Sequence, residues 1–143
     1  MLKKMLMTAS VLGMGLAASS AHAESVSCVL ENEKVLTLSN LSTAPVYSYG
    51  TAGNFEMVLP QGSAEGTVYK GEESFSGGGA SYIAFTNGNY TYVAYSGIGR
   101  GWSFDGLRLY NGSEIILEQP CKIPEAMRYS YPSINAPEDL LPY

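Results

Sequence analysis

Histidine is nearly absent from this chain, and the single one, His22, lies in a segment with the features of an export leader. Two lysines near the start are followed by an uncharged apolar run over residues 5–18, and residues 21–23 read Ala-His-Ala, an A-x-A cleavage pattern. The sequence therefore predicts a signal peptide over residues 1–23 and a mature protein located in the periplasm.

Removal of this leader would leave a mature protein without histidine. Such a protein has no imidazole base, no Ser-His or Cys-His nucleophile pair, and no imidazole ligand for zinc or copper. A Ser-x-x-Lys sequence, which serves some histidine-free acylases, is missing as well. We therefore expect a protein that is not an enzyme and that has no catalytic site, no metal site and no cofactor.

No long hydrophobic run follows the leader, and the leader's own apolar run is too short to cross a bilayer. Cys28 lies close behind the cleavage pattern, which raises the alternative of a lipid-anchored protein. It is preceded by Ser25-Val26-Ser27, whereas an anchor signal has an apolar residue followed by small ones. The sequence thus argues against a lipid anchor and predicts no membrane span.

Basic residues are few: without the leader, six lysines and arginines stand against thirteen acidic residues, a net charge of −7. A net-acidic chain without a basic cluster is a poor nucleic-acid binder, because contacts to phosphate supply most of that affinity. We therefore expect no nucleic-acid partner. The charge is compatible with steering toward a cationic protein, although solubility alone is the commoner reason for such a charge.

Cysteine is scarce too, with only Cys28 and Cys121 in the chain. An even count in an oxidising compartment favours a disulfide between them, which would tie the first strand to the last. The closed loop of about 93 residues would stabilise the fold by about 4–5 kcal/mol in the chain-entropy model. A reactive thiol pair is the alternative, but the chain has no Cys-x-x-Cys sequence.

Helical periodicity is nearly missing between residues 26 and 119, where short runs of β-branched and aromatic residues are separated by Gly, Asn and Pro. Eight or nine such runs predict an all-β fold, an antiparallel barrel or sandwich, with one domain over residues 24–121. Residues 122–143 hold four of the seven prolines and are predicted to be a tail, either disordered or lying along the domain. The expected strands are Ser27–Leu30, Val35–Leu38, Val46–Tyr49, Phe55–Leu59, Gly66–Tyr69, Ser81–Thr86, Tyr90–Tyr95, Leu107–Tyr110 and Ile115–Gln119.

Two Asn-Gly pairs predict hairpins, because Asn-Gly suits a turn whose central residues have positive φ. A two-residue turn at Asn87-Gly88 pairs Phe85 with Tyr90 and leaves both faces of the hairpin largely apolar. We therefore expect this hairpin to be central, with other parts of the protein covering each side. At Asn111-Gly112 we expect a three-residue loop that matches Leu109 with Ile115, with Gly112 in a left-handed conformation. One face of the first hairpin carries Ser81, Ile83, Phe85, Tyr90, Tyr92 and Ala94, and the other carries Tyr82, Ala84, Thr91, Val93 and Tyr95.

Glycine is concentrated in two stretches, residues 77–79 and residues 97–101, which lie at the same end of the predicted central hairpin. Glycines at strand ends are typical of bulges and sharp barrel corners, and this structural interpretation alone could account for them. In the functional interpretation, bare backbone lets two neighbouring loops enter something narrow, or lets a ligand approach closely. The candidate binding residues are then Ser76, Ser81, Ser96 and Arg100 as hydrogen-bonding groups, and Tyr82, Tyr95 and Trp102 as aromatic anchors.

The sequence Ser96-Gly97-Ile98-Gly99-Arg100, and more loosely Ser76-Gly77 ahead of Tyr82, resembles the Ser-Gly loop of the periplasmic lysozyme inhibitors. These are small exported β-barrel proteins, often with a disulfide, that push such a loop into the active-site cleft of lysozyme. The resemblance implies that Ser76, Tyr82, Ser96 and Arg100 face an enzyme cleft. An acidic inhibitor would also suit a strongly basic lysozyme.

We therefore expect an exported binding protein, in the first place an inhibitor or immunity-type protein whose partner is a cell-wall-degrading enzyme such as lysozyme. A periplasmic module that binds glycan or peptidoglycan through Trp102 and nearby tyrosines is the second hypothesis. The third is an envelope accessory protein that recruits a partner through its tail, residues 122–143.

Overall fold

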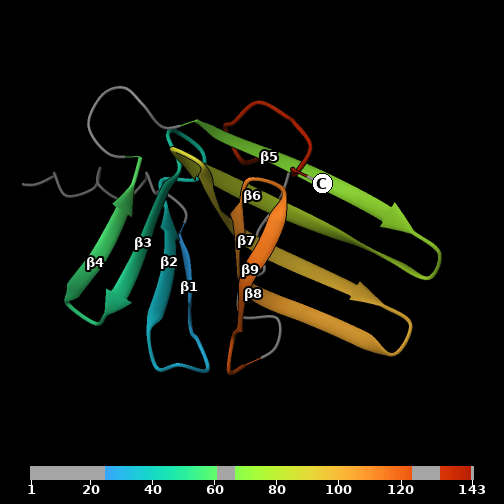
Figure 1. Cartoon of the computed structure of the whole chain (residues 1–143), viewed down its shortest axis with the longest axis horizontal. Helices are drawn as coiled ribbons and strands as arrows, with labels where there is room; N and C mark the ends of the chain where they lie inside the picture. The colour runs from blue at the N-terminus through green and yellow to red at the C-terminus, as the bar shows by residue number, and fades with distance from the viewer. Residues whose placement is uncertain (1–24, 61–66, 124–132, 143) are drawn as a thin grey trace, which may run out of the picture.

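The computed structural model describes residues 25–60, 67–123 and 133–142. These residues form two antiparallel sheets, with strand orders β1-β2-β3-β4 and β5-β6-β7-β8-β9 (Figure 1). The strands are β1 (Val26–Val29), β2 (Val35–Ser39), β3 (Val46–Thr51), β4 (Asn54–Leu59), β5 (Val68–Phe75), β6 (Gly78–Asn87), β7 (Tyr90–Gly99), β8 (Trp102–Asn111) and β9 (Glu114–Pro120).

A strand forms at each of the nine expected positions, so the prediction of an all-β fold is confirmed. The two sheets share one core, which makes the fold sandwich-like, and the described strands do not close into a barrel. The second sheet has longer strands than expected, because β6, β7 and β8 run on through the glycine stretches to ten residues each. Residue 66, the expected first residue of the fifth strand, lies outside the described residues.

The first sheet packs one face onto the core between the sheets. β2 alternates between buried and half-buried residues, as expected of a strand with a single covered face. Its buried residues Leu36 and Leu38 cluster with Tyr47 of β3 and with Ile83 and Phe85 of the second sheet. The rings of Tyr47 and Phe85 have their centroids 5.5 Å apart, so an aromatic contact joins the two sheets.

The β6–β7 hairpin is covered on both faces, as its sequence predicts. Ile83 and Phe85 point into the core between the sheets, whereas Tyr82 and Val93 belong to a second buried cluster on the other face. That second cluster includes Leu141 from the C-terminal tail. The apolar character of both faces is therefore explained by two cores on opposite sides of one sheet.

The predicted register of this hairpin is wrong by two residues. Asn87 pairs with Tyr90 across the turn Gly88-Asn89, so Phe85 lies opposite Tyr92. Gly88 has a φ of +65° at the first central position, the position that a type II′ turn gives to glycine. The prediction placed Asn and Gly together at the centre of the turn, but of the two only the glycine has positive φ. Because a shift of two residues preserves the alternation of side chains, both faces keep their predicted residues.

The β8–β9 hairpin also differs from its prediction of a three-residue loop. Its turn has two residues, Gly112-Ser113, and Ile115 pairs with Tyr110. A register shift between Leu109 and Tyr110 then brings Leu109 opposite Leu117. Gly112 has a φ of +62°, so the predicted left-handed conformation is confirmed. The β8–β9 pairing therefore follows from a bulge, a feature that single-sequence alternation does not reveal.

The predicted disulfide between Cys28 and Cys121 is confirmed, with the two Cα atoms 5.7 Å apart. Beside it, Leu30 forms a β-bridge with Cys121. The Glu31 N–H donates a hydrogen bond of 2.9 Å to the carbonyl of Pro120. The first strand is therefore tied to the last by a covalent bond and by backbone hydrogen bonds.

The described part of the tail lies along β5, the edge strand of the second sheet. The Lys70 N–H donates a hydrogen bond of 2.8 Å to the carbonyl of Pro137, and the Asp139 N–H donates one of 3.0 Å to the carbonyl of Lys70. Ile134 packs into the core between the sheets, and Leu141 packs into the second cluster. The tail thus contributes a buried side chain to each core and covers part of an exposed sheet edge.

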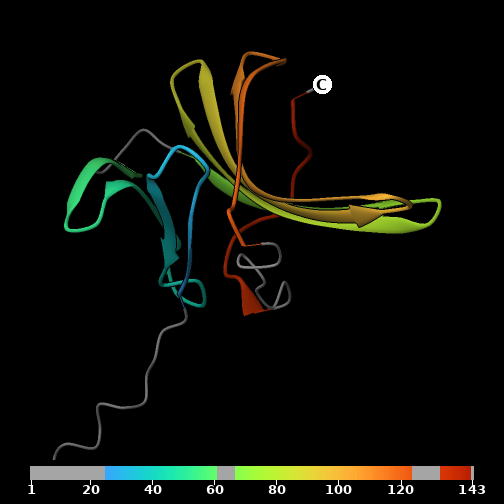
Figure 2. The same ribbon diagram turned by 90° about the horizontal axis from the view of Figure 1, so that it is seen from below.

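The second sheet is sharply bent, as Figure 2 shows in the view from below. One half of the sheet faces the first sheet, and the other half carries the β5–β6 and β7–β8 hairpins away from the body of the protein (Figure 1). We call this projecting half, residues 72–81 and 96–105, the arm. The two glycine stretches lie in the arm.

Candidate functional site

The two hairpin turns lie side by side at the tip of the arm in both views (Figures 1 and 2). The first turn is Ser76-Gly77, and the second is Arg100-Gly101. Gly77 and Gly101 have φ values of +86° and +74° at the second central position, where a type II turn requires positive φ. Glycine is therefore needed at these two positions for the chain to reverse.

The two turns are also in contact with each other. A methyl group added at Gly77 would lie only 3.0 Å from Cγ and from Nε of Arg100. The side chain of Arg100 therefore lies against the bare backbone of the neighbouring turn, while the residue as a whole remains exposed. This contact makes the two hairpins a single tip rather than two independent loops.

Two further glycines of the arm, Gly97 and Gly99, make room for aromatic rings. A Cβ atom at Gly99 would lie 2.2 Å from Nε1 of Trp102, and one at Gly97 would lie 3.2 Å from the far edge of the same indole. The indole thus covers glycine backbone and reaches Phe75, whose ring centroid is 5.7 Å from its own. Gly97 and Gly99 are therefore strand residues whose bare backbone is covered by the indole, and they are neither corners nor free loops.

Further aromatic residues continue this surface toward the second buried cluster. The rings of Tyr82 and Tyr95 are parallel, with centroids 6.4 Å apart, and Phe104 meets Tyr95 edge-on at 6.2 Å. The guanidinium of Arg108 lies 4.0 Å from the centre of the Tyr95 ring, which is the geometry of a cation–π contact. The Tyr95 hydroxyl donates a hydrogen bond of 3.0 Å to Glu73. These contacts support the exposed aromatic pair at the tip from below.

The opposite face of the arm carries a polar row across four strands. Glu72 pairs with Ser81, Ser81 with Ser96, and Ser96 with Asp105. The Ser96 hydroxyl donates a hydrogen bond of 2.9 Å to Oδ1 of Asp105. The other oxygen of this carboxylate, Oδ2, is buried and has no hydrogen-bond partner among the described residues. This row is polar, but its serines are half-buried, in contrast to the exposed tip.

The structure brings three of the seven predicted binding residues together. Ser76, Arg100 and Trp102 lie at the tip, where Ser76 and Arg100 are exposed and Trp102 keeps 43% of its surface accessible. Ser81 and Ser96 lie farther down the arm, on the polar row of the opposite face. The predicted residues therefore divide between two faces and do not form one continuous surface.

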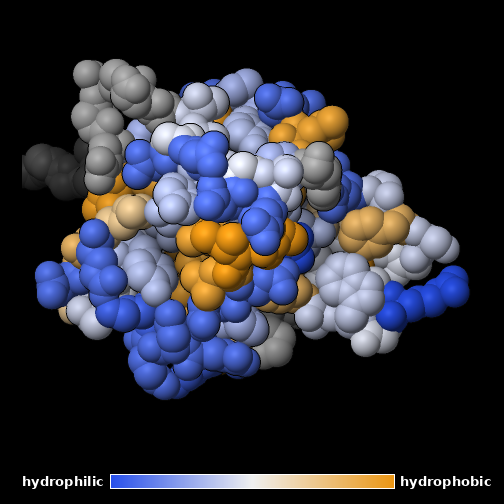
Figure 3. Space-filling view, viewed as in Figure 1, coloured by the Kyte–Doolittle hydropathy of each residue, from blue (hydrophilic) through white to orange (hydrophobic). Residues whose placement is uncertain are grey.

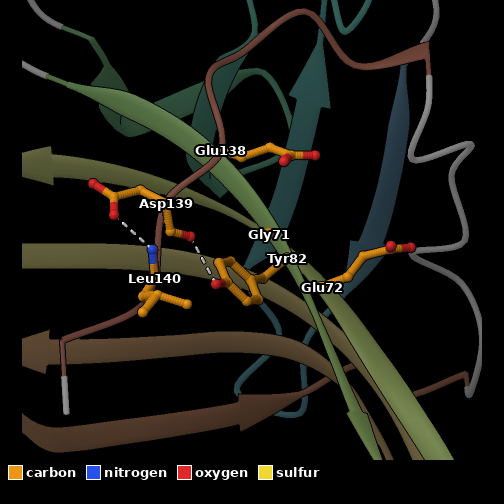
Figure 4. A pocket seen from close by; sticks show the side chains of 6 residues that line it. All are labelled: Gly71, Glu72, Tyr82, Glu138, Asp139 and Leu140. Atoms are coloured by element: carbon orange, nitrogen blue, oxygen red, sulfur yellow. Dashed lines mark hydrogen bonds between the residues drawn. The ribbon is translucent and has the colours of Figure 1, made fainter.

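Tyr82 lies at a third place, beneath the tail. It has no exposed surface, and its hydroxyl donates a hydrogen bond of 2.8 Å to the backbone carbonyl of Asp139 (Figure 4). A cavity of about 490 Å³ opens here, lined by Gly71, Glu72, Tyr82, Glu138, Asp139 and Leu140. The ring of Tyr82 holds the tail against the sheet and is not available as an anchor at the tip.

Phe75 belongs to the tip but was missed from the sequence. It is 37% exposed and stands opposite Gly78, next to Trp102. The sequence contains a signal that could have found it. Gly78 and Gly99 can be read as strand residues instead of strand ends. Phe75, Gly78, Gly99 and Trp102 then form a row across the four strands, and the side chains of Phe75 and Trp102 lie on the same face at its two ends.

The buried tyrosines of the second cluster predict a loss of stability at alkaline pH. Burial, and then the hydrogen bond to Glu73, raise the pKa of Tyr95 to about 12, and burial raises the pKa of Tyr69 to about 12. Unfolded phenols ionise near pH 10, so between about pH 10 and 12 only the unfolded chain releases these protons. Stability should be fully present below pH 10 and fall as the pH rises toward 12.

Urea unfolding at a series of pH values measures this slope, and absorbance at 295 nm follows the ionisation of the phenols. Tyr95→Phe and Tyr69→Phe should each reduce the slope between pH 10 and 12. A free energy of unfolding that stays constant over this interval would contradict the assignment.

The tip gathers polar and aromatic groups on one exposed surface. It presents a guanidinium, a hydroxyl and two aromatic rings, the kinds of group that dominate recognition surfaces. Among the described residues, no group of three or more histidine, cysteine or acidic side chains is placed to hold a metal ion. Within the same ranges, no helix has the length and apolar content needed to cross a bilayer.

Comparison with protein-family models, with curated proteins and with solved structures finds no significant match to this chain. The chain is thus defined as an all-β, sandwich-like protein with one disulfide and a projecting two-hairpin arm. The resemblance of its Ser-Gly sequences to those of lysozyme inhibitors remains a hypothesis. Its function is inferred from the geometry of the arm.

Proposed function

We propose that this protein is an exported binding protein that inserts the tip of its arm into the active-site cleft of a cell-wall-degrading enzyme, such as lysozyme, and blocks it. The observation that carries the proposal is the joint projection of the two hairpin turns with Ser76, Arg100 and Trp102 together at their tip. The two adjacent turns contact each other through Arg100 and Gly77 and so form a single projecting tip. The leader-like segment at residues 1–23 and the confirmed disulfide are consistent with a site of action in the periplasm.

The charge at the tip suits such a cleft. Glycosidases of this class commonly hold two carboxylates on either side of the bond that they cleave. The guanidinium of Arg100 can form a bidentate, charge-assisted pair with a carboxylate, and Ser76 adds a hydroxyl beside it. The net-acidic remainder of the protein would favour encounter with a basic enzyme.

The test is inhibition of a panel of lysozymes and peptidoglycan amidases by the processed protein, residues 24–143, at micromolar concentration. We expect Arg100→Ala to raise the inhibition constant at least tenfold, about 1.4 kcal/mol, because the tip loses its cation. Lys122→Ala is the matched control, since it removes an equal charge from a residue that pairs with Glu33 far from the arm.

Full activity of every enzyme in the panel would remove the inhibitor function from consideration. An equal loss of inhibition in the arginine and lysine variants would show that overall charge, and not the tip, determines the effect. Circular dichroism of both variants checks that the fold is retained.

A second function, binding to glycan, is favoured by the exposed pair Phe75 and Trp102. Their planes are inclined by 38°, and together they form an apolar platform of the kind on which sugar rings stack. Co-sedimentation with purified peptidoglycan separates the two functions, because an enzyme inhibitor need not bind the polymer. If the glycan function holds, Trp102→Ala should abolish co-sedimentation while Arg100→Ala leaves most of it.

A further inference from the structure

An apolar cleft of about 270 Å³ opens between the two sheets at the end of the protein opposite the arm. Tyr49 and Met57 form its wall on the first sheet, and Leu109 and Leu117 form its wall on the second. The hydroxyl of Tyr49 accepts a hydrogen bond of 3.0 Å from Asn32 at the rim. The cleft is lined by Tyr47, Tyr49, Glu56, Met57, Tyr92, Leu107, Leu109 and Leu117.

The strand beside this cleft, β9, is the edge of the second sheet. Within the described ranges no strand pairs with its outer side between Glu114 and Gln119. The Asn32 N–H donates a hydrogen bond of 3.1 Å to the side chain of Gln119, and backbone hydrogen bonding begins with the bond from Glu31 to Pro120. Three consecutive apolar residues of β9, Ile115, Ile116 and Leu117, are 44%, 46% and 38% exposed. Figure 3 shows an apolar area at the centre of this face, where Figure 1 places β9.

Two features therefore coincide that are usually avoided at a protein surface. An edge strand leaves backbone N–H and C=O groups without partners, and proteins normally shield such an edge with charge, with proline or with a covering segment. Here the edge carries exposed apolar residues, and Leu117 belongs both to the exposed strand and to the wall of the cleft. The apolar lining of the cleft thus continues onto the open edge.

We infer that β9 is a docking site for an extended peptide segment of a partner protein. The segment adds a strand to the free edge of the second sheet, so that main-chain hydrogen bonds supply affinity. Every second side chain of an added strand lies on the face that carries Leu117, and one of these side chains enters the cleft. A volume of about 270 Å³ accepts one large apolar side chain such as leucine, methionine or phenylalanine.

The charges around β9 indicate which peptide fits. Glu114 is exposed at one end of the strand, Glu118 pairs with Arg108 near the other, and Glu56 at the cleft pairs with Lys34. The three carboxylates therefore outnumber the two cations that pair with them, and the side chains of Glu118 and Glu56 stay 46% and 47% exposed. A segment with lysine or arginine on either side of its apolar residues would place opposite charges next to these carboxylates.

A second copy of this chain fits less well. If two β9 strands paired so that Ile116 faced its counterpart, Glu114 of each copy would lie opposite Glu118 of the other, and like charges facing each other across a strand pair are destabilising. A hydrocarbon chain also fits less well, because it has no N–H or C=O groups to pair with the open backbone edge of β9.

This site is separate from the tip of the arm. The residues of β8 that pair with β9 are Gly106–Asn111, whereas the tip of the arm lies at the other end of β8, beside Trp102. The inference therefore does not depend on the proposed function, and either can fail without the other.

Nuclear magnetic resonance of the ¹⁵N-labelled processed protein tests the inference. The probe is a blocked peptide, Lys-Val-Thr-Leu-Thr-Val-Lys, whose central leucine is the side chain for the cleft, and its control has glutamate in place of both lysines. We expect the lysine peptide to shift the amide resonances of residues 114–119 and of Tyr49 and Met57, with the resonances of the tip unchanged. The glutamate peptide should bind at least tenfold more weakly.

A pair of variants tests the role of the strand itself. Leu117→Lys places a cation at the mouth of the cleft and should weaken binding of the lysine peptide at least tenfold. Leu140→Lys makes the same change at a residue that is 73% exposed in the tail, and it should bind the peptide as the unmodified protein does. Because both leucines are already partly exposed, both variants should fold, and their amide spectra verify it.

Three results would overturn the inference. The first is the absence of any shift at millimolar peptide. The second is a set of shifts confined to the arm, or produced only by a decyl-chain detergent below its micelle concentration. The third is sedimentation showing that the protein self-associates and that Leu117→Lys disperses the assembly, which would assign β9 to contact between copies.

Discussion

Replacement of both cysteines, Cys28→Ser together with Cys121→Ser, is expected to lower the free energy of unfolding by about 4–5 kcal/mol. The bridge joins residues that are 93 positions apart in the chain, so its loss restores conformational freedom to almost the whole unfolded domain. A small domain commonly has about 5–15 kcal/mol of stability, so a loss of this size removes about a quarter of it or more. Urea unfolding followed by circular dichroism measures the change.

Reduction of the unmodified protein is the control, because it breaks the same bridge without introducing serine. Reduced protein and the double variant should unfold at similar urea concentrations. The hydrogen bonds beside the bridge, from Glu31 to Pro120 and from Lys122 to Val29, should keep the first and last strands together in the folded state. A loss below about 1 kcal/mol would mean that the unfolded chain is already held compact by other contacts, contrary to the chain-entropy account.

The fold was largely predictable from the sequence, because strand formation depends on short-range alternation and on glycine and asparagine between the runs. The two covered faces of the β6–β7 hairpin are a clear case, since both its odd and its even positions are apolar. The register of the strand pairs was harder to predict from the sequence. The choice between Asn87-Gly88 and Gly88-Asn89 as the turn depends on a single backbone angle at Gly88, and both choices give the same pattern of faces.

The arm was only partly predictable. Ser76, Arg100 and Trp102 were correctly placed near one another because two glycine stretches at one end of a hairpin must be neighbours. The full length of the arm's strands was not predicted, because glycine commonly marks the end of a strand, whereas here Gly97 and Gly99 are strand residues under an indole ring. Such a role depends on which ring faces the glycine across the strand pair, and this requires the register to be known.

Burial of Tyr82 could not be derived from the central hairpin alone. Its hydroxyl is bound by the carbonyl of Asp139, a residue 57 positions further along the chain. The alternation of side chains along β6 places Tyr82 on the correct face of the sheet, but it does not show which part of the protein covers that face. Contacts with the distant tail bury Tyr82, and no sequence pattern around Tyr82 predicts these contacts.

The glycines of the arm predict a second large effect, this time from a single methyl group. Gly78→Ala is expected to lower the free energy of unfolding by about 3 kcal/mol, because the new Cβ atom would lie 1.9 Å from the backbone carbonyl oxygen of Ile98 and 2.7 Å from Cα of Gly99. Both atoms belong to the main chain of β7, which cannot rotate away. The β6–β7 pairing must therefore open at the base of the tip, and amide hydrogen exchange should accelerate on both strands there.

Gly99→Ala is the matched control, since it adds the same methyl group one strand away. There the nearest atoms are Nε1 and Cε2 of the Trp102 indole, at 2.2 and 2.6 Å, and this partly exposed side chain can swing outward. We expect a loss of stability below about 1 kcal/mol together with a red shift in fluorescence emission, for which Trp102 is the only tryptophan in the chain. Equal losses of stability in the two variants would contradict the close approach of β6 to β7. The expected difference would show that backbone packing at Gly78, and not only the indole at Gly99, requires glycine in the arm.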